Sequence, residues 1–377
     1  MQTDLMQIFR DACAKKASDL HFLPQDGVCI LYYRLDGALK EMERYNLAQY
    51  QEILTRIKGM SQLDIGETRL PQDGRIRLAI DSKNVDFRLA TLPTIFGEKL
   101  TVRIMQPMNS HLSPEQIFTN PEDLANFKKT ISHAFGLILF CGKTGSGKTT
   151  TAYTAIQELS KGQKLSIHSV EDPVEYTLPT VAQTQIQPKF GLGFPSAIRC
   201  VLRHDPDVLF VSEVRDQETM ELMLKAVVTG HLVISSLHVS DSISAAQRLL
   251  EIGVSPYMAA SALSTVVSQV LLRRVCKHCC EEVTLDEATA LHFGILEGLK
   301  IKEARGCESC NHTGYRGRMA IYEFLHFTKA MKDMIRAQNI TGLQDHLVVS
   351  GHKSLKDRAR EAVVAGHTTI EEMSRLT

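Results

Sequence analysis

Two different spacings of apolar residues mark the first hundred positions of the chain. Near the start, apolar residues recur at helical spacing behind a polar capping residue, which predicts a capped helix. The members of this stripe are Leu5, Ile8, Phe9 and Ala12. Residues 76–80 and 85–89 instead alternate apolar and polar positions, a pattern that predicts a β-hairpin. Together with a β-rich run at 28–34, these patterns favour an α+β domain over 1–105.

A different pattern follows a proline-containing stretch at 106–122, which we interpret as a linker. Beyond it, short apolar runs that predict strands alternate with helical stretches, the first of which is 149–160. The predicted strands are 136–142, 165–170, 208–211 and 232–236. Strands that alternate with helices usually pair in parallel. We therefore expect an α/β core over 123–272, a cysteine-rich segment over 273–320 and a helical subdomain over 321–377.

Composition narrows the class of protein. The chain has 377 residues, which at about 150 residues per domain allows two or three domains. Lys plus Arg number 43, Asp plus Glu also number 43, and apolar residues make up 44%. This balance excludes a disordered chain and argues against a dedicated nucleic-acid-binding protein, which shows a basic excess. The apolar runs fall far short of the roughly 18 residues of a membrane span, and acidic residues interrupt the N-terminal segment, unlike a signal peptide. We therefore expect a soluble, cytoplasmic protein.

The strongest local motif is GKTGSGKT, which matches the phosphate-binding pattern GxxxxGK[ST] between a predicted strand and a predicted helix. Its glycines let backbone N–H groups turn toward phosphate oxygens, and the helix N-terminus adds positive potential. Lys148 is expected to reach the β- and γ-phosphates and Thr149 to bind Mg²⁺. A glycine-rich turn that matches by chance is the alternative. The expected nucleotide-binding residues are Gly142, Lys143, Thr144, Gly145, Ser146, Gly147, Lys148, Thr149 and Thr150.

Acidic residues follow two of the predicted strands. The strand 208–211 delivers Glu213 near its end, where a carboxylate can hold magnesium or orient an attacking water. The alternative for Glu213 is an ordinary surface glutamate. The segment EDPVEY follows the strand 165–170, and its spacing fits an acidic turn as readily as a catalytic one. Its acidic residues are Glu171, Asp172 and Glu175.

Two histidines, His231 and His238, flank the predicted strand 232–236. A pair that brackets a strand beside a phosphate-binding loop can sense the γ-phosphate of a nucleotide, whereas a single histidine is more often structural. The spacing alone does not decide between these two interpretations.

Five of the nine cysteines cluster late in the chain, and four of them form two CxxC pairs. Four thiolates suit a tetrahedral Zn²⁺ with Zn–S bonds of about 2.3 Å. Redox-active or merely buried CxxC motifs are the alternative, and His278 and Cys280 offer substitute ligands at less suitable spacing. The predicted metal ligands are Cys276, Cys279, Cys307 and Cys310.

With these segments in view, the chain resembles the secretion ATPase superfamily, the motors of type II secretion and type IV pilus systems. The resemblance extends from residue 17 to residue 323, and the order and number of motifs make it specific. In chain order, the matching segments are ASDLHF, LPQDGRI, FRLATLPT, GEKLTVRI, GKTGSGKTTT, VEDPVEY, LRHDPDVLFVSEVRD, TGHLVISSLH and the cysteine pairs ending in GYRGRMAIYE.

The resemblance implies roles for the residues that match the family's motifs. It makes Lys148, Glu213 and Glu171 catalytic, with Glu213 also at the Mg²⁺. Ser212 precedes Glu213 where the family usually has glycine. Arg199 and Arg203 match arginines whose roles are less defined. The other matches are the Asp box (Glu171, Asp172 and Glu175), the His box (His231 and His238) and the arginine-finger candidates (Arg75, Arg88 and Arg103).

The resemblance also implies an architecture and partners. It implies a PAS-like N-terminal domain, a RecA-like P-loop ATPase domain with a Cys₄ zinc-binding insertion, and a homo-hexameric ring. The cofactors would be ATP, Mg²⁺ and Zn²⁺. The expected partner is an integral membrane platform protein, through which the ring would act on pilin subunits from the cytoplasmic face of the membrane, without direct contact with nucleic acid.

The cysteine pairs and the position of the first motif suggest a subfamily. Assembly ATPases usually carry the four cysteines and retraction ATPases usually lack them, so we expect an assembly motor. ASDLHF begins at residue 17, so we expect the additional N-terminal docking domain of longer relatives to be absent or reduced to one helix. Short enzymes of this plan resemble the competence-pilus assembly ATPases of Gram-positive bacteria, which implies a role in DNA uptake. The alternatives are a nucleic-acid motor, a nucleotide-gated scaffold with little turnover, and a retraction motor.

Overall fold

The structure is a computed structural model that describes residues 5–81, 83–105, 113–162, 164–296 and 298–376. The chain folds into two compact units, which are Met1–Ser110 and His111–Thr377. Residues 106–112 of the predicted linker lie outside the described residues, and its remainder carries a short helix and the start of a second one. No described helix has the length and apolar character needed to cross a membrane.

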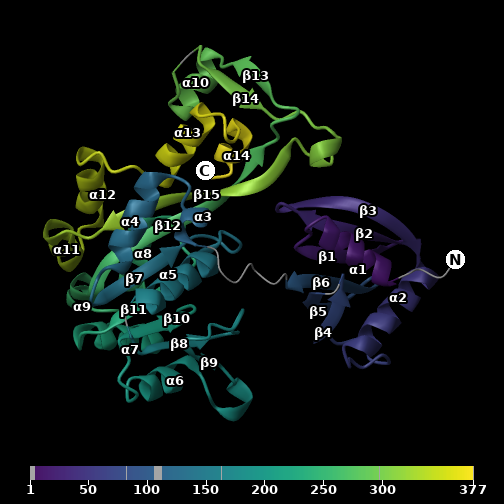
Figure 1. Ribbon diagram of the computed structural model, residues 1–377, viewed down its shortest axis with the longest axis horizontal. Coiled ribbons are helices and arrows are strands. Elements are labelled where there is room, and N and C mark those ends of the chain that lie inside the picture. Colours follow the sequence, from purple (N-terminus) through teal and green to yellow (C-terminus); the bar gives the residue numbers. More distant parts are fainter. Residues whose placement is uncertain (1–4, 82, 106–112, 163, 297, 377) are drawn as a thin grey trace. The chain divides into compact units, whose positions relative to one another are not determined.

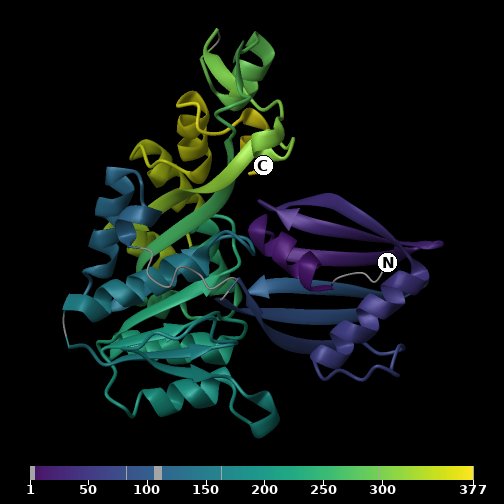
Figure 2. The same ribbon diagram turned by 45° about the vertical axis from the view of Figure 1, so that its right-hand side comes forward.

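The first unit is a six-stranded antiparallel sheet with two helices packed on one face (Figure 2). The strand order is β3-β2-β1-β6-β5-β4. The predicted helix is confirmed, since α1 buries the four residues of the apolar stripe. The predicted hairpin is also confirmed as β4 and β5. The elements are α1 (Leu5–Ala14), β1 (Asp19–Gln25), β2 (Val28–Leu35), β3 (Ala38–Asn46), α2 (Leu47–Met60), β4 (Gln72–Ile80), β5 (Lys83–Thr94) and β6 (Gly97–Met105).

The second unit is built on a seven-stranded sheet in the order β15-β12-β7-β11-β10-β8-β9 (Figure 1). All neighbouring strands pair in parallel except β15, which runs antiparallel to β12 at one edge. The predicted parallel sheet is therefore confirmed, with each of the four predicted strands in it. The strands are β7 (Gly136–Cys141), β8 (Ile167–Glu171), β9 (Ala182–Gln185), β10 (Val208–Val211), β11 (Leu232–Leu237), β12 (Leu263–Val275) and β15 (Tyr315–His326).

Helices cover both faces of this sheet, which explains why its central strands β7, β10 and β11 are mostly apolar. Alternate residues of β7 enter two different cores: Leu137 and Leu139 face one side, and Ile138 and Phe140 face the other. One side is covered by α6 (Phe194–Val201), α7 (Gln217–Val228), α8 (Ser242–Glu251), α9 (Pro256–Ala262), α11 (Lys329–Arg336) and α12 (Ile340–Val349). The other side is covered by α3 (Pro114–Ile117), α4 (Pro121–Ile131) and α5 (Lys148–Gly162).

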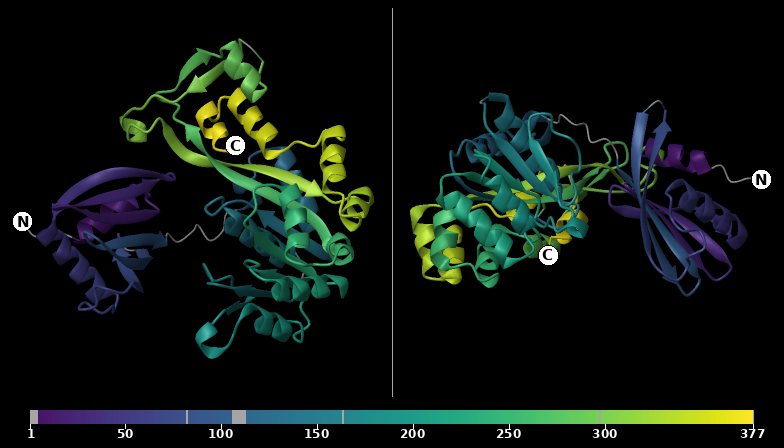
Figure 3. Two further views of the ribbon diagram at one scale, coloured as in Figure 1. Left: turned by 180° about the vertical axis from the view of Figure 1, so that it is seen from behind. Right: turned by 90° about the horizontal axis from the view of Figure 1, so that it is seen from below.

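The cysteine-rich segment forms a lobe at the far end of β12 and β15, the two long strands that Figure 3 shows leaving the sheet. A third core joins the lobe to the last helices of the chain. Residues 273–275 still belong to β12, and 321–326 belong to β15, so both strands extend past the segment boundaries expected from sequence. The elements here are β13 (Glu281–Thr284), α10 (Glu287–Phe293), β14 (Lys300–Glu303), α13 (Leu355–Val364) and α14 (Ile370–Ser374).

A buried ion pair fixes α14 to β12. The Arg273 N–H and Nε groups donate to Glu372 at 2.7 and 2.8 Å, and the guanidinium lies 3.8 Å from the ring centroid of Tyr315. Glu372 is 2% exposed. Burying either charge alone is costly, so each of them depends on the other.

We expect Glu372→Ala to lower the free energy of unfolding by about 3–5 kcal/mol, because it leaves the Arg273 charge buried without its partner. Chemical denaturation monitored by circular dichroism measures this change. Glu371→Ala is the matched control, since Glu371 also contacts Arg273 but its side chain is 64% exposed, and exposed pairs contribute about 1 kcal/mol or less. Equal losses in the two variants would show that burial does not govern this interaction.

Candidate nucleotide site

Four loops meet at one edge of the second sheet because β7, β8, β10 and β11 are parallel and end together. They enclose a cavity of about 390 Å³. Much of the predicted site lines this cavity, together with residues from β12 and β15. The lining residues are Thr144, Gly145, Gly147, Lys148, Thr149, Thr150, Glu171, Asp172, Pro173, Glu175, Ser212, Glu213, Ser236, His238, Leu271 and Arg318.

The glycine-rich loop between β7 and α5 depends on backbone shapes that only glycine adopts freely. Gly142, Gly145 and Gly147 have φ values of +148°, +80° and +92°. A Cβ atom on Gly142 would also overlap the backbone carbonyl oxygen of Gln269 on β12. The loop is therefore folded tightly against the neighbouring strand, with its N–H groups available at the N-terminus of α5.

Lys148 turns its ammonium group back onto the loop. Its Nζ donates to the carbonyl oxygens of Gly142 and Lys143 at 2.7 and 3.1 Å. Burial lowers the pKa of Lys148 from its ordinary value, and the negative charge of Glu213 opposes that shift. The two carbonyl groups keep the charged amine solvated at the position from which it can reach an anion in the cavity.

Glu171, at the end of β8, is buried and bound by three donors. The Tyr153 hydroxyl makes a very short hydrogen bond to one oxygen, while Ser169 Oγ and Gln183 Nε2 donate to the other at 2.5 and 3.0 Å. The Tyr153 hydroxyl also accepts from the backbone N–H of Glu175. This network holds the acidic segment 171–175 against α5, and it occupies both oxygens of Glu171.

Glu213 is less enclosed and faces a guanidinium group and an imidazole ring. Arg215 makes a short ion pair with one of its oxygens, and His238 Nε2 lies 3.6 Å from the other. The same guanidinium lies 3.6 Å from Asp172. The Ser212 hydroxyl accepts from the backbone N–H of Asp172 at 3.3 Å. Arg215 and Ser212 therefore link the loop after β10 to the loop after β8.

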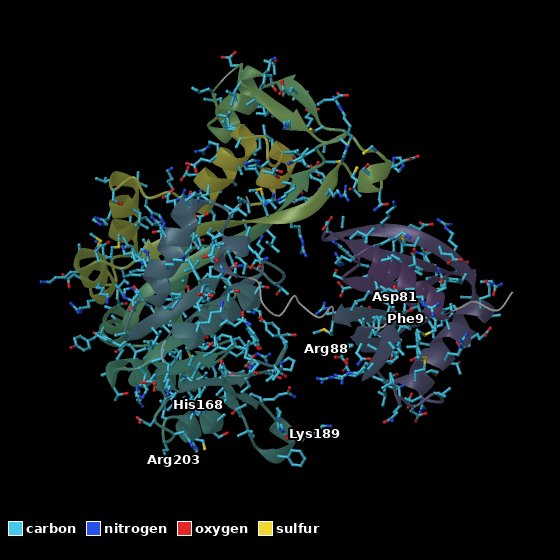
Figure 4. All side chains as sticks on the ribbon, in the orientation of Figure 1. Phe9, Asp81, Arg88, His168, Lys189 and Arg203 are labelled. Atoms are coloured by element: carbon cyan, nitrogen blue, oxygen red, sulfur yellow. The ribbon has the colours of Figure 1, made fainter. Side chains whose placement is uncertain are left out.

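Several predicted site residues lie elsewhere. His231 precedes β11, at the opposite end of the strand from His238, and its Nδ1 lies 2.8 Å from the carbonyl oxygen of Ala226. Of the two histidines that flank this strand, His238 therefore lines the cavity and His231 does not. Arg199 forms an ion pair with Glu218. Arg203, labelled in Figure 4, donates to the carbonyl oxygen of Arg199, and neither arginine lines the cavity.

Gly142, Lys143 and Ser146 line a second, adjoining cavity of about 750 Å³. Sequence reasoning missed Arg215, Leu271 and Arg318. The signal for Arg215 was available, because it sits two residues after Glu213 within the matched segment. Arg318 also lies within a matched segment, GYRGRMAIYE, whereas no local motif marks Leu271. Both residues reach the cavity because β12 pairs with β7 and β15 pairs with β12.

The four predicted cysteine ligands form one cluster. Their sulfur atoms all lie within 4.8 Å of one another, and three of the S···S distances are 3.9, 3.8 and 3.8 Å. Backbone N–H groups of Gly306, Cys307 and Gly314 point at the sulfur atoms of Cys279 and Cys310. Burial alone would raise the pKa of the Cys310 thiol, but the N–H groups lower it to about 6. Cys310 is therefore the cysteine of the cluster that most favours the thiolate, whereas burial and hydrogen bonds with the other cysteines raise the pKa of Cys279 to about 12.

The three arginine-finger candidates of the first unit stand in one row across its sheet. Arg75 pairs with Arg88, and Arg88 pairs with Arg103, on the face opposite the two helices. Figure 4 labels Arg88 on β5. Arg103 donates to the buried Asp19 at 2.8 Å. Burial alone would raise the pKa of Asp19, but hydrogen bonds from Arg103 and Ser18 lower it below its usual value. Like charges on paired strands repel, so this row is suited to binding an anion.

The fold and the cavity define the second unit as a P-loop protein of the RecA-like α/β class. The chain belongs to the family of type II/IV secretion system proteins, whose model matches residues 1–375. It is 37% identical, over 99% of its own length, to "Type IV pilus assembly ATPase PilB" of Thermus thermophilus. It is 36% identical, over 98% of its length and 76% of the relative's, to "Type II secretion system protein HxcR" of Pseudomonas aeruginosa.

The chain spans 42% of the Thermus protein and 66% of the PilB of Myxococcus xanthus, to which it is 37% identical over 97% of its own length. Solved structures share the fold at lower identity. The pilus retraction motor PilT with bound ADP aligns at a TM-score of 0.67 and 22% identity, over 99% of this chain and 96% of that one. The DotB ATPase of Yersinia pseudotuberculosis aligns at 0.71 and 18% identity, over 100% of this chain and 93% of that one.

We expect Tyr153→Phe to cost about 1–3 kcal/mol of stability, because it leaves an oxygen of the buried Glu171 without its donor. Urea denaturation measures the loss. Tyr176→Phe is the matched control: its ring packs on that of Tyr153 with centroids 4.3 Å apart, and its hydroxyl has no hydrogen-bond partner among the residues that the structure describes. If both variants lose the same amount, ring packing rather than the hydrogen bond holds Glu171.

Proposed function

We propose that the chain hydrolyses ATP and that this hydrolysis drives assembly of a type IV-like pilus or a secretion pseudopilus. The observation that carries the proposal is the meeting of Lys148, Thr149, Glu213 and the acidic segment 171–175 in one cavity. A P-loop lysine, a hydroxyl group for magnesium and a carboxylate near the reacting phosphate are the parts that phosphoryl transfer to water requires. The relatives include pilus assembly ATPases and type II secretion proteins, and their names support assembly as the process that hydrolysis drives.

We assign roles to side chains within this proposal. Lys148 leaves its two loop carbonyl groups to bind the nucleotide phosphates, and Thr149 and Glu213 would hold Mg²⁺, which neutralises phosphate charge when bound. Glu213 orients the attacking water, with Arg215 and His238 fixing its two oxygens. The resemblance implies a catalytic role for Glu171, but three hydrogen-bond donors already bind its carboxylate oxygens. We therefore assign it the task of holding Asp172 and Glu175 in place.

We further propose that the arginines of the first unit complete the site, within one chain or between neighbouring chains of a homo-hexamer. The pairings of β4, β5 and β6 place three guanidinium groups in one cross-strand row, and Arg103 within it already binds a carboxylate, that of Asp19. A nucleotide triphosphate is also an anion, and arginine charge at the transferring phosphate accelerates hydrolysis by a factor of about 10³–10⁵. The same proposal includes a PAS-like fold for the first unit and a homo-hexameric ring.

We propose Zn²⁺ as the ion of the cysteine cluster. A tetrahedral ion with Zn–S bonds of about 2.3 Å requires S···S separations of about 3.8 Å, and the three measured distances are 3.9, 3.8 and 3.8 Å. The N–H donors to sulfur offset part of the negative charge of four thiolates. The metal would fasten the lobe at the ends of β12 and β15. The presence of the cluster favours an assembly motor over a retraction motor.

The partner in this proposal is an integral membrane platform protein reached from the cytoplasmic side, through which pilin subunits are moved indirectly and without contact with nucleic acid. DNA uptake through a competence pilus stays a prediction of the sequence.

The first test is steady-state ATP hydrolysis as a function of protein concentration, with Lys148→Ala as the blank. We expect Lys148→Ala to abolish turnover. Glu213→Gln should lower kcat at least about 100-fold, because a carboxylate that orients water contributes that much to hydrolysis. Specific activity should rise with concentration if arginines from a neighbouring chain complete the site. Near-normal hydrolysis by Lys148→Ala would contradict the assignment of the site.

The second test concerns the metal. We expect about one zinc per purified chain by elemental analysis, and loss of most of it in Cys310→Ser, with a lower unfolding temperature. Cys200→Ser is the control, since Cys200 is an exposed cysteine outside the cluster. Equal zinc content in wild type and Cys310→Ser would show that the cluster is not a metal site.

A further inference from the structure

Gln269 lies on β12 directly beside the phosphate-binding loop. Its side chain is buried, and its Nε2 donates to the carbonyl oxygen of Ser146 at 2.8 Å. Its backbone carbonyl oxygen occupies the space that a Cβ on Gly142 would need, and its Nε2 would lie 3.1 Å from a Cβ on Gly147. The loop therefore rests on Gln269 at three of its residues.

Two buried polar atoms at this contact have no partner among the residues that the structure describes. They are Gln269 Oε1, an acceptor, and Ser146 Oγ, a hydroxyl that can donate. Gln269 is 1% exposed and Ser146 is 5% exposed. An unpaired buried polar group costs free energy, and native structures rarely keep two complementary ones side by side without a use for them.

Lys148 makes a change of loop conformation necessary in the proposed reaction. Its ammonium group donates to the carbonyl groups of Gly142 and Lys143, so it must release both when it binds phosphate. Ser146 lies between Lys143 and Lys148 in the loop, and its N–H already donates to the Lys143 carbonyl group at 3.2 Å. Release of Lys148 therefore alters the same short stretch of backbone that carries the unpaired hydroxyl.

We propose that Gln269 is the positioning residue of the phosphate-binding loop: its Nε2 holds the Ser146 carbonyl group, and its Oε1 receives the Ser146 hydroxyl when nucleotide binds. The inference rests on the proposed ATP site and adds a residue outside every motif of that site. A glutamine is required because one side chain must donate and accept at once. Leucine has a similar volume but can do neither, and glutamate has no donor.

The test is a double-mutant cycle with Gln269→Leu, Ser146→Ala and the combined variant, measured as affinity for a fluorescent ATP analogue with Mg²⁺ and as KM and kcat for ATP. We expect Gln269→Leu to raise Kd and KM roughly tenfold, with kcat changed less than about threefold, because a hydrogen bond to the loop is lost in ground and transition states alike. Ser146→Ala should weaken binding less, and the combined variant should bind no more weakly than Gln269→Leu.

Gln344→Leu is the matched control. Gln344 and Gln269 both line the cavity of about 750 Å³ that adjoins the nucleotide cavity, but Gln344 belongs to α12. Its affinity should equal that of wild type. Gln269→Glu keeps the shape and the acceptor but removes the donor and buries a carboxylate at a position that is 1% exposed, so it should weaken binding and also lower the unfolding temperature, while far-UV circular dichroism stays unchanged.

The outcomes separate the inference from the function on which it rests. Wild-type affinity in both Gln269 variants, or effects of Gln269→Leu and Ser146→Ala that simply add, would overturn the inference and leave the ATP site intact. A fall in kcat at constant KM would indicate loss of folded protein rather than loop positioning, and it would overturn the inference as well. Failure of wild type to bind the analogue would overturn the proposed function itself.

Discussion

The parallel pairing of β8, β10, β11 and β7 is the constraint on which the rest of the second unit depends. Each strand is largely buried, so most of its residues contribute packing, and most of the polar chemistry lies at the strand ends and in the loops that follow them. Because all four strands point the same way, those loops meet at one edge of the sheet. Lys148, Glu171 and Glu213 come together for this reason, although they are far apart in the sequence.

The acidic groups at that edge differ in how deeply they are buried, and their roles differ accordingly. Glu171 sits deep, where a carboxylate is tolerated only with its oxygens satisfied, and three donors satisfy them. Glu213 lies further out. Its neighbours are Arg215 and His238, and water or a nucleotide can replace either of them. A deep, saturated carboxylate holds structure, whereas a shallow one is free to exchange its partners during a reaction. The two glutamates therefore differ in role because they differ in depth.

Sequence patterns predicted the strands, the phosphate-binding loop and Glu213, because each depends on spacing within a few residues. They did not show which of His231 and His238 lies at the phosphate edge. Strand direction decides this, because only a residue that follows a parallel strand lies at that edge. Gln269 carried no local signal at all, because it lies in an ordinary apolar run and reaches the loop through the pairing of β12 with β7, which are more than a hundred residues apart in the chain. Arg318 lies in the matched segment GYRGRMAIYE, but only the pairing of β15 with β12 shows that it reaches the cavity.

The same pairings give the cysteine lobe a physical connection to the nucleotide cavity. β12 carries Gln269 under the loop, Leu271 into the cavity and Arg273 into the buried pair with Glu372, and Cys276 follows directly. β15 begins close after Cys310 and places Arg318 in the same cavity. A ladder of backbone hydrogen bonds keeps the two strands in register over nearly their whole length. Ordering of the lobe therefore fixes the strand ends, and through them the wall against which the phosphate-binding loop is folded.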